Sequence, residues 1–387
     1  MDSGKNGHGA RIKSVMDLAG VSRIDFFVNT HYHEDHYGGV DDLVQDEGIT
    51  VVNSFDRGEK DELDCTKRNQ VTFTDYQAAL GNNAAQLTHG QTIPLDPQMT
   101  VTCIASGGIV IGEQNPVIGV DENDKSVALL IEFEDFRYFV GGDIELTTEG
   151  KIAQRDLVLD VEVYQANHHG SHTSSSQAFM EDLLPSVVVI SNGNHGGHQH
   201  PRQQTLTLLA GLSPAPTVFQ TNKYFKGGAG GNVVDEFIAD PQSMDQDGTI
   251  LVTVSSSTGQ YTVTYPDASH TFAIKPRDGT AAVVIESLLP NPIGNDRMLE
   301  EVTVRNSGST VVSLASWTLR DKSGHAMSLT SLGDIAPGQS LTIRRNGMAM
   351  SLNNNGDIIT LFGPSNQPRD SFSYTASTEG QRIVTGH

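Results

Sequence analysis

The sequence predicts a chain of two parts, an α/β unit followed by an all-β unit. Its 387 residues exceed the length of one typical domain. Short apolar, β-prone runs alternate with helical patterns in the first part, whereas only β-prone runs separated by Gly, Asn and Pro turns follow residue 280. The stretch 268–280 has the composition of a linker. We therefore expect domains at 1–267 and 281–376, with a tail at 377–387.

Each predicted element has a local signal. Continuous apolar runs rich in Val, Ile and Phe predict strands, and helical spacing between turn residues predicts helices. Asp135 lies in a turn between two such runs and predicts a hairpin. The predicted strands of the first part are 24–28, 51–55, 101–105, 126–133, 137–140, 161–166 and 187–190, and its helices are 40–45, 75–80, 177–184 and 203–209.

The most informative stretch, Thr30-His31-Tyr32-His33-Glu34-Asp35-His36, directly follows the first predicted strand. His31 and His33, two residues apart, can aim both imidazoles at one metal, while Asp35 and His36 can aim at a second beside it. Imidazole and carboxylate ligands suit Zn²⁺, and also Mn²⁺ or Fe. Two metals about 3.5–4 Å apart can activate a water molecule and stabilise both oxygens of a displacement. The plain alternative is a His-rich surface loop.

This stretch resembles the H-x-H-x-D-H loop of the metallo-β-lactamase superfamily. Further motifs resemble its branch of ComEC-type competence proteins: Met1-Asp2-Ser3-Gly4, Phe139-Val140-Gly141-Gly142-Asp143, Asn167-His168-His169-Gly170-Ser171, and Ser191-Asn192-Gly193 followed by His200-Pro201. The resemblance covers roughly residues 1–265. It implies an αββα sandwich with the metals at one sheet edge, and it implies that Asp2 supports the His loop.

The resemblance also implies the ligand set. His31 and His33 would hold the first metal, Asp143 would bridge, and the second metal would bind Asp35, His36 and His168. His169 is adjacent to His168, and of the two we favour His168 as the ligand. The expected cofactor is up to two Zn ions, with Mn or Fe as alternatives.

The catalytic residues expected from the resemblance are Asp35, Asp143 and His200. His200, which precedes Pro201, would contact phosphate or donate a proton. The residues expected to face the substrate are His169, Ser171, Thr173 and His200, although hydroxyls in a Gly/Ser-rich loop are more often turn-formers.

The chain departs from the family in two places. Many members carry another His ligand after the strand that here is 101–105, but Ser106-Gly107-Gly108 follows it. Cys103 within that strand is either a thiolate ligand or a small core residue. The family's first strands, which would precede Asp2, are absent, so the chain looks truncated. A secretion signal would have been lost with them, which leaves an extracellular or periplasmic location open.

The net charge of −22 bears on the substrate. Eight Lys/Arg face nine Asp/Glu after residue 280, so the first 280 residues carry about −21. Without a basic track, tight nonspecific DNA binding is disfavoured, although metals could neutralise phosphates locally. No apolar run approaches the roughly 20 residues that span a bilayer. Two cysteines, Cys65 and Cys103, do not make a disulfide framework.

We therefore expect a metal-dependent hydrolase of phosphoester or phosphodiester bonds, acting on a small phosphoester or on DNA. The alternatives are a DNA nuclease of the ComEC type, a β-lactamase-like amide hydrolase, and a non-catalytic metal-binding or adhesion protein. The last part, with strands at 283–286, 301–304, 341–343 and 357–362, resembles the immunoglobulin-like lamin-tail domain. It would bind or space rather than catalyse, with a protein, a cell surface or a polymer as partner.

Overall fold

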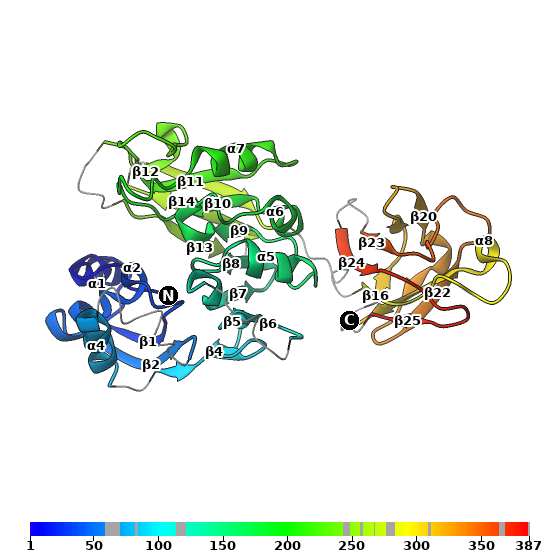
Figure 1. Ribbon diagram of the computed structural model, residues 1–387, viewed down its shortest axis with the longest axis horizontal. Coiled ribbons are helices and arrows are strands. Elements are labelled where there is room, and N and C mark those ends of the chain that lie inside the picture. The colour runs from blue at the N-terminus through cyan, green and yellow to red at the C-terminus, as the bar shows by residue number, and fades with distance from the viewer. Residues whose placement is uncertain are drawn as a thin grey trace. The chain divides into compact units, whose positions relative to one another are not determined.

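The computed structural model forms two compact units, Met1–Lys275 and Pro276–His387 (Figure 1). It describes residues 1–58, 70–81, 84–113, 121–242, 248–255, 258–266, 268–275, 283–308, 311–363 and 368–385. The last five residues of the predicted linker, 276–280, and Cys65 lie outside the described residues. Among the helices of the described part, none is long and apolar enough to cross a membrane.

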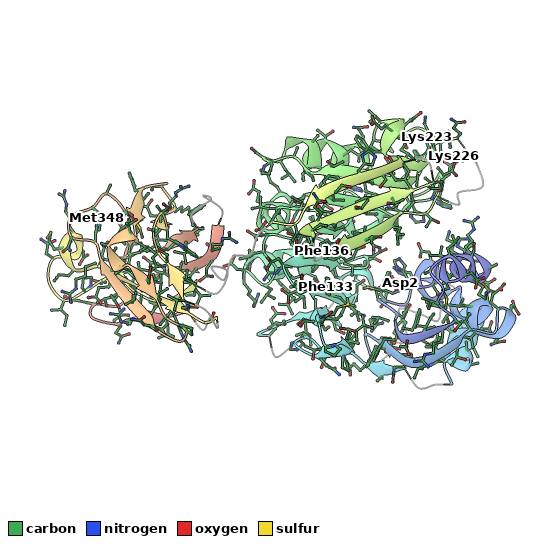
Figure 2. All side chains as sticks on the ribbon, turned by 180° about the vertical axis from the view of Figure 1, so that it is seen from behind. Asp2, Phe133, Phe136, Lys223, Lys226 and Met348 are labelled. Carbon is green, nitrogen blue, oxygen red and sulfur yellow. The ribbon has the colours of Figure 1, made fainter. Side chains whose placement is uncertain are left out.

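A long mixed sheet is the largest element of the first unit. Its strand order is β12-β11-β10-β9-β8-β7-β5-β4, with β6 paired to β5. Strands β8 to β12 are mutually parallel, whereas β4, β5, β7 and β8 pair antiparallel. The predicted hairpin at Asp135 is present, because Phe133 pairs with Phe136 across the turn (Figure 2). The bounds are β4 Thr92–Asp96, β5 Met99–Ser106, β6 Ile109–Val110, β7 Ala128–Phe133, β8 Phe136–Val140, β9 Val163–Gln165, β10 Val187–Ile190, β11 Thr217–Asn222 and β12 Ile238–Asp240.

Both faces of this sheet are covered. Helices α5 (Leu146–Ala153), α6 (Gln177–Leu183) and α7 (Gln203–Gly211) pack on one face through a shared apolar core. A three-stranded sheet, β13 (Leu251–Ser255), β14 (Gln260–Tyr265) and β15 (Ala268–Ala273), packs on the other. Strand β10 is buried along its whole length, which explains its continuous apolar sequence.

A second, parallel sheet carries the His loop. It consists of β1 (Arg23–Val28), β2 (Thr50–Asp56) and β3 (Ala85–Gln86). Val28 packs towards β5, β7 and β8, whereas Phe27 packs towards α2 (Glu34–Tyr37) and α4 (Gln70–Ala79). Alternate residues of β1 therefore enter different cores. Helix α1 (Gly9–Leu18) and the π-helix η1 (Asp42–Asp46) meet through Met16 and Leu43.

The predicted strands and helices of the first unit are present, but two helices, α1 and α5, and strands β3, β4 and β6 were missed, and no bounds were predicted for the strands after β10. Helix α1 buries only Gly9 and Met16, and α5 buries the polar Thr148 and Glu149 beside Ile152, so neither has a clear apolar stripe. The linker prediction was wrong for 268–273, because all six residues pair with β14. Half-buried and exposed positions alternate in this strand, but most of its residues are small or polar, so the sequence shows no alternation of apolar and polar residues.

The second unit consists mainly of β-strands, as predicted, and contains one short helix, α8. Two four-stranded sheets, β22-β17-β16-β25 and β20-β19-β23-β24, enclose one core that includes the fully buried Trp317. The predicted tail contributes β25, which pairs with β16. The bounds are β16 Val283–Leu289, α8 Asp296–Leu299, β17 Glu301–Asn306, β18 Val312–Ser313, β19 Thr318–Arg320, β20 Ala326–Ser328, β21 Asp334–Ile335, β22 Ser340–Arg344, β23 Asp357–Phe362, β24 Pro368–Tyr374 and β25 Ile383–Val384.

Truncation tests where the first unit ends. A chain ending at Lys275 keeps β15 and the bonds from Lys275 Nζ to Asp160 and to the Leu184 carbonyl, so it should fold cooperatively. A chain ending at Pro266 loses these bonds and leaves Tyr261 without Phe272, on which it stacks. We expect its melting temperature to be lower by roughly 6 °C or more, from a loss of about 3 kcal/mol. Equal melting temperatures in calorimetry would contradict this boundary.

Candidate metal centre

The His loop begins where β1 ends, and several bonds fix it. The Asn29 side-chain amide donates to the His31 carbonyl at 2.7 Å, and the Val127 N–H donates to the Thr30 carbonyl at 2.9 Å. The backbone N–H of Tyr32 donates to Glu122 at 2.8 Å. His31 is completely buried. The first imidazole of the motif is therefore held inside the protein by groups from other segments.

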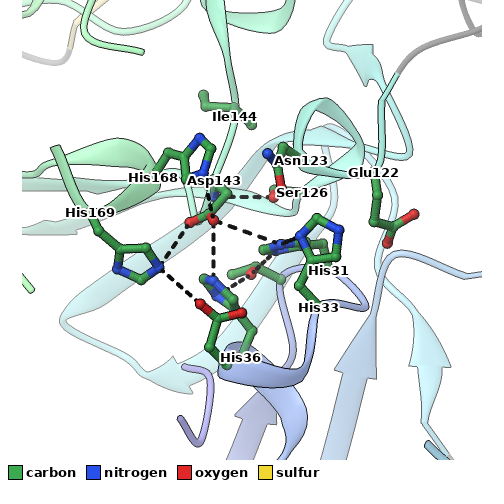
Figure 3. A network of polar contacts seen from close by, with 12 residues as sticks. His31, His33, His36, Glu122, Asn123, Ser126, Asp143, Ile144, His168 and His169 are labelled. Atoms are coloured by element: carbon green, nitrogen blue, oxygen red, sulfur yellow. Dashed lines mark hydrogen bonds and ion pairs between the residues drawn. The ribbon is translucent and has the colours of Figure 1, made fainter. Parts of the chain in front are cut away.

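Asp143 lies at the centre of the imidazoles, just after β8 (Figure 3). Its own N–H donates to Ser126 Oγ at 3.1 Å. The Nε2 atoms of the surrounding imidazoles lie 3.3–3.9 Å from its carboxylate: 3.3 Å for His36, 3.8 Å for His168 and 3.9 Å for His31 to Oδ2, and 3.7 Å for His169 to Oδ1.

Two groups of side chains have ligand atoms within 4.8 Å of one another. One group is His31, His36 and Asp143, and the other is Asp35, His36 and His169. His33 joins the first group through its Nδ1, which lies 3.0 Å from His31 Nε2. The structure thus brings together all six residues predicted as ligands. It differs from the prediction in one respect, because His169 rather than His168 meets Asp35, at 3.6 Å.

The inner nitrogens of His36 and His169 are suited to a metal. His36 Nδ1 lies 2.9 Å from Asp2, and His169 Nδ1 lies 2.9 Å from the Ser191 carbonyl. The Nε2 atom of each ring is buried and makes no hydrogen bond within the described residues. Carboxylates lie just beyond hydrogen-bonding geometry, with Asp143 at 3.3 Å from His36 Nε2 and Asp35 at 3.6 Å from His169 Nε2. An outer bond to carboxylate or carbonyl is usual for metal-binding histidine. The donor set therefore fits a divalent transition metal.

Asp2 supports the loop, as the resemblance implied. It accepts the Thr30 N–H at 2.7 Å and the Thr30 hydroxyl at 3.0 Å, in addition to its contact with His36. The bond fixes the ring orientation of His36 and places a negative charge behind it. The first residues of the chain are thus part of the centre.

His168 is held differently from His169. Its Nδ1 lies 3.1 Å from Glu145 and 3.2 Å from the Thr173 hydroxyl, and its side chain is partly exposed. Both histidines have left-handed backbone conformations, with φ of 49° and 55°. This turn lets neighbouring rings approach Asp143 from different directions, which a sequence motif does not reveal.

Several acidic residues that the sequence analysis did not single out build the surroundings. Glu122 binds the Arg57 guanidinium at 2.6 Å and the Tyr32 N–H, with both charged groups buried. Glu149 is fully buried and accepts the Asn167 side chain at 2.9 Å and two backbone N–H groups at 175–176. These contacts join distant segments, so no local spacing signalled them.

The residues predicted to face the substrate lie in the same loops. Ser171 Oγ is 3.0 Å from the Thr173 hydroxyl, which donates to Glu145 at 2.7 Å. The His200 ring lies 5.2 Å from that of His168 between centroids. Burial and the neighbouring His168 lower the pKa of His200 to about 3. At neutral pH His200 is therefore uncharged, and both of its predicted roles stay predictions.

Cys103 is a core residue. It is fully buried with Val28 and Leu129, and its thiol donates to the Ala105 carbonyl at 3.3 Å. Burial raises the pKa of this thiol to about 12, so it stays protonated. Of the two alternatives left by the sequence, the structure supports the core role.

The charges of the centre compensate one another. Burial alone would disfavour the Asp143 carboxylate, but His36 and His169 outweigh it and hold its pKa well below the usual value. Burial likewise opposes a charged His36, but Asp143 and Asp2 raise the pKa of His36 well above 6.5. Burial and the nearby His36 lower the pKa of His31, which is therefore neutral. In the absence of metal, the positive charge of protonated His36 compensates the negative charge of the Asp143 carboxylate.

Known proteins resemble both units. The family model of the lamin tail domain matches residues 276–376. ComE operon protein 3 of Bacillus subtilis (strain 168) is 23% identical over 195 residues, which cover 49% of this chain and 23% of the relative. Competence protein ComA of Neisseria gonorrhoeae is 31% identical over 85 residues, covering 22% of this chain and 12% of the relative. These likenesses confirm the resemblance to competence proteins and to the lamin tail. The chain spans less than a quarter of the length of either competence protein.

Two solved structures are also similar. A metal-dependent hydrolase from Parabacteroides distasonis ATCC 8503 has a TM-score of 0.32 and 13% identity, covering 52% of this chain and 77% of that protein. A variant of the CmlA beta-hydroxylase has a TM-score of 0.31 and 13% identity, covering 51% and 43%. At these TM-scores the likeness carries no argument about fold or chemistry.

The raised pKa of His36 predicts how metal affinity depends on pH. Metal and proton compete for His36 Nε2, so affinity should fall as the pH is lowered below the raised pKa and rise as the pH approaches it. Asp2→Asn removes one of the carboxylates that raise this pKa. This substitution should shift the pH range over which metal affinity changes to lower pH, and it should weaken metal binding by about 10- to 100-fold.

The measurement is competition against a chelating dye between pH 5 and 9. Asp17→Asn, which alters an exposed carboxylate on α1, serves as the control. An affinity that does not change with pH, or an Asp2→Asn variant that behaves like the control, would contradict this account of His36.

Proposed function

We propose that the first unit is a metal-dependent hydrolase of phosphodiester bonds with the αββα sandwich of the metallo-β-lactamase superfamily. One observation carries the proposal. The Nε2 atoms of His36 and His169 are buried without hydrogen bonds, each ring is oriented through its other nitrogen, and both face the buried carboxylate of Asp143. Burying polar atoms without hydrogen bonds is costly, and a bound metal would replace the missing bonds.

The geometry supports a revised division of the ligands. His31, His33 and Asp143 would hold one ion, and Asp35, His36, His169 and Asp143 would hold the other. Zn, Mn and Fe all suit this donor set. When bound, two divalent ions make a coordinated water acidic and withdraw charge from the bond under attack.

The protein's own groups would position the substrate beside the ions. His168 is backed by Glu145 and its Nε2 lies 3.8 Å from Asp143, so its ring can meet an oxygen of a substrate held there. The uncharged His200 adjoins it. The likeness to competence proteins supports a phosphodiester substrate, and among phosphodiesters it keeps DNA as the second candidate. The strongly acidic composition favours a small or short substrate over a long duplex.

The second unit would serve a separate purpose. Both candidate metal groups found among the described residues belong to the first unit. We propose that the lamin-tail-like unit binds a protein, a cell surface or a polymer and takes no part in hydrolysis.

Metal content distinguishes the two adjacent histidines. The purified protein should contain one to two Zn or Mn ions per chain by elemental analysis. His169→Ala should lose about one ion, because it removes a ligand. His168→Ala should keep its ions and lose turnover. His325→Ala, an exposed histidine in the second unit, should change neither. If the His168→Ala variant loses metal and the His169→Ala variant does not, His168 is the ligand, as first predicted.

Asp143 tests whether the centre is catalytic. Asp143→Ala should lower hydrolysis of bis-p-nitrophenyl phosphate by at least roughly a hundredfold, because it removes the carboxylate that both ions share. Far-UV circular dichroism should remain that of the folded protein. Asp17→Ala, at an exposed site on α1, should retain full activity. If the two variants hydrolyse the ester at the same rate, the assignment is refuted.

A further inference from the structure

One long stretch of this acidic chain has no acidic residue. The chain contains 47 Asp and Glu, yet none occurs between Asp182 and Asp235. The same stretch carries Arg202, Lys223 and Lys226, together with three histidines near the metal centre, His195, His198 and His200. The stretch itself contributes no carboxylate that would repel an anionic ligand.

Two loops of this stretch are joined to each other. Asn194 Oδ1 accepts the Phe225 N–H at 3.0 Å, and Gln199 Oε1 accepts the Ala229 N–H at 2.9 Å. A Cβ atom at Gly196 would lie 3.7 Å from Lys226 Cγ. We call the two loops, residues 193–199 and 223–229, the rim.

The rim presents the one exposed aromatic ring of the chain. All Phe, Tyr and Trp residues are among those described, and Phe225 alone is exposed, at 42%. The preceding Tyr224 is buried, and its N–H and carbonyl both bind the side chain of Asn232. The ring is thus displayed on an anchored backbone, as in the aromatic platforms on which nucleic-acid bases stack.

Two lysines flank this ring in the sequence, and Lys223 Nζ lies 5.9 Å from the ring centroid. Lys223 is paired with Asp235 at 2.7 Å, but Lys226 is exposed and has no ion-pair partner in the described part of the chain. Figure 2 shows both lysines at the periphery of the first unit. An exposed ring followed in the sequence by an exposed lysine offers one contact for a base and one for a phosphate.

The rim leads to the metal centre through a row of imidazoles. Ring centroids lie 4.8 Å apart for His195 and His198, 5.9 Å for His198 and His200, and 5.2 Å for His200 and His168. His168 in turn lies 3.8 Å from Asp143. A ligand bound on the rim would therefore extend along these rings towards the reacting bond.

We propose that the rim is a nucleotide subsite, in which Phe225 stacks on a base and Lys226 contacts a phosphate of a short single strand. The proposal rests on the proposed function only for the identity of the bond that is cleaved. A single free lysine can hold one or two phosphates, which agrees with the lack of a basic track for a duplex. With this subsite, the enzyme would prefer phosphodiesters that carry a nucleotide base over phosphodiesters that carry none.

Binding of a short oligonucleotide tests the subsite without relying on turnover. The full-length chain with Asp143→Ala, which prevents cleavage, is titrated against a fluorescent single-stranded dT hexamer and its abasic analogue. Phe225→Ala should weaken dT binding about tenfold and leave abasic binding unchanged. Phe225→Trp should restore dT binding. Lys226→Ala should weaken both ligands and reduce the salt slope by about 0.7. Val234→Ala, which alters another exposed apolar side chain of this unit, is the control.

The results separate the subsite from the proposed function. Equal dT affinity in the Phe225→Ala variant and the parent protein, or equal affinity of the parent for dT and abasic strands, overturns the subsite. Competition by poly-glutamate as strong as that by oligo-dT overturns it too, because it would show a general anion site. Base-dependent binding in a protein that hydrolyses no diester would support the subsite and reject the proposed hydrolysis.

Discussion

The buried carboxylate of Asp143 is the constraint on which the centre depends. An ionised carboxylate with 3% exposure is stable only among compensating charges and hydrogen-bond donors. Four imidazoles surround it, and the charge on one of them, His36, is sustained by a second carboxylate at Asp2. A divalent ion in place of that proton would add one positive charge to a site that holds the carboxylates of Asp2, Asp35 and Asp143. The arrangement is therefore preorganised for a cation.

Strand order explains how residues far apart in the chain converge. Strands β8, β9 and β10 are parallel neighbours, so their carboxyl ends meet at one edge of the sheet. Asp143 follows β8, His168 and His169 follow β9, and Ser191, which orients His169, follows β10. The His loop follows β1 of the other sheet. Loops on strand ends thus supply the reactive groups, while the strands between them supply a rigid core.

Local patterns predicted the strands and the His loop, because each depends on neighbours in sequence, and the resemblance to competence proteins pointed to Asp143. The local patterns did not predict features of the site that are determined by tertiary contacts. The choice between His168 and His169 depends on two successive left-handed residues, and Glu122 and Glu149 act across 17 or more residues of chain. The acid-free stretch was visible in the sequence all along. Its significance required the structure, which joins its two loops beside the centre.

Trp317 gives the two units different optical signatures. It is the only tryptophan of the chain, and it is completely buried in the core of the second unit. Indole fluorescence excited selectively therefore reports the second unit alone, while the first contributes only tyrosine emission. Since both candidate metal groups of the described chain lie in the first unit, adding metal should be silent in this signal unless the units communicate. A change in tryptophan emission on metal binding would thus be a direct optical measure of coupling between the two domains.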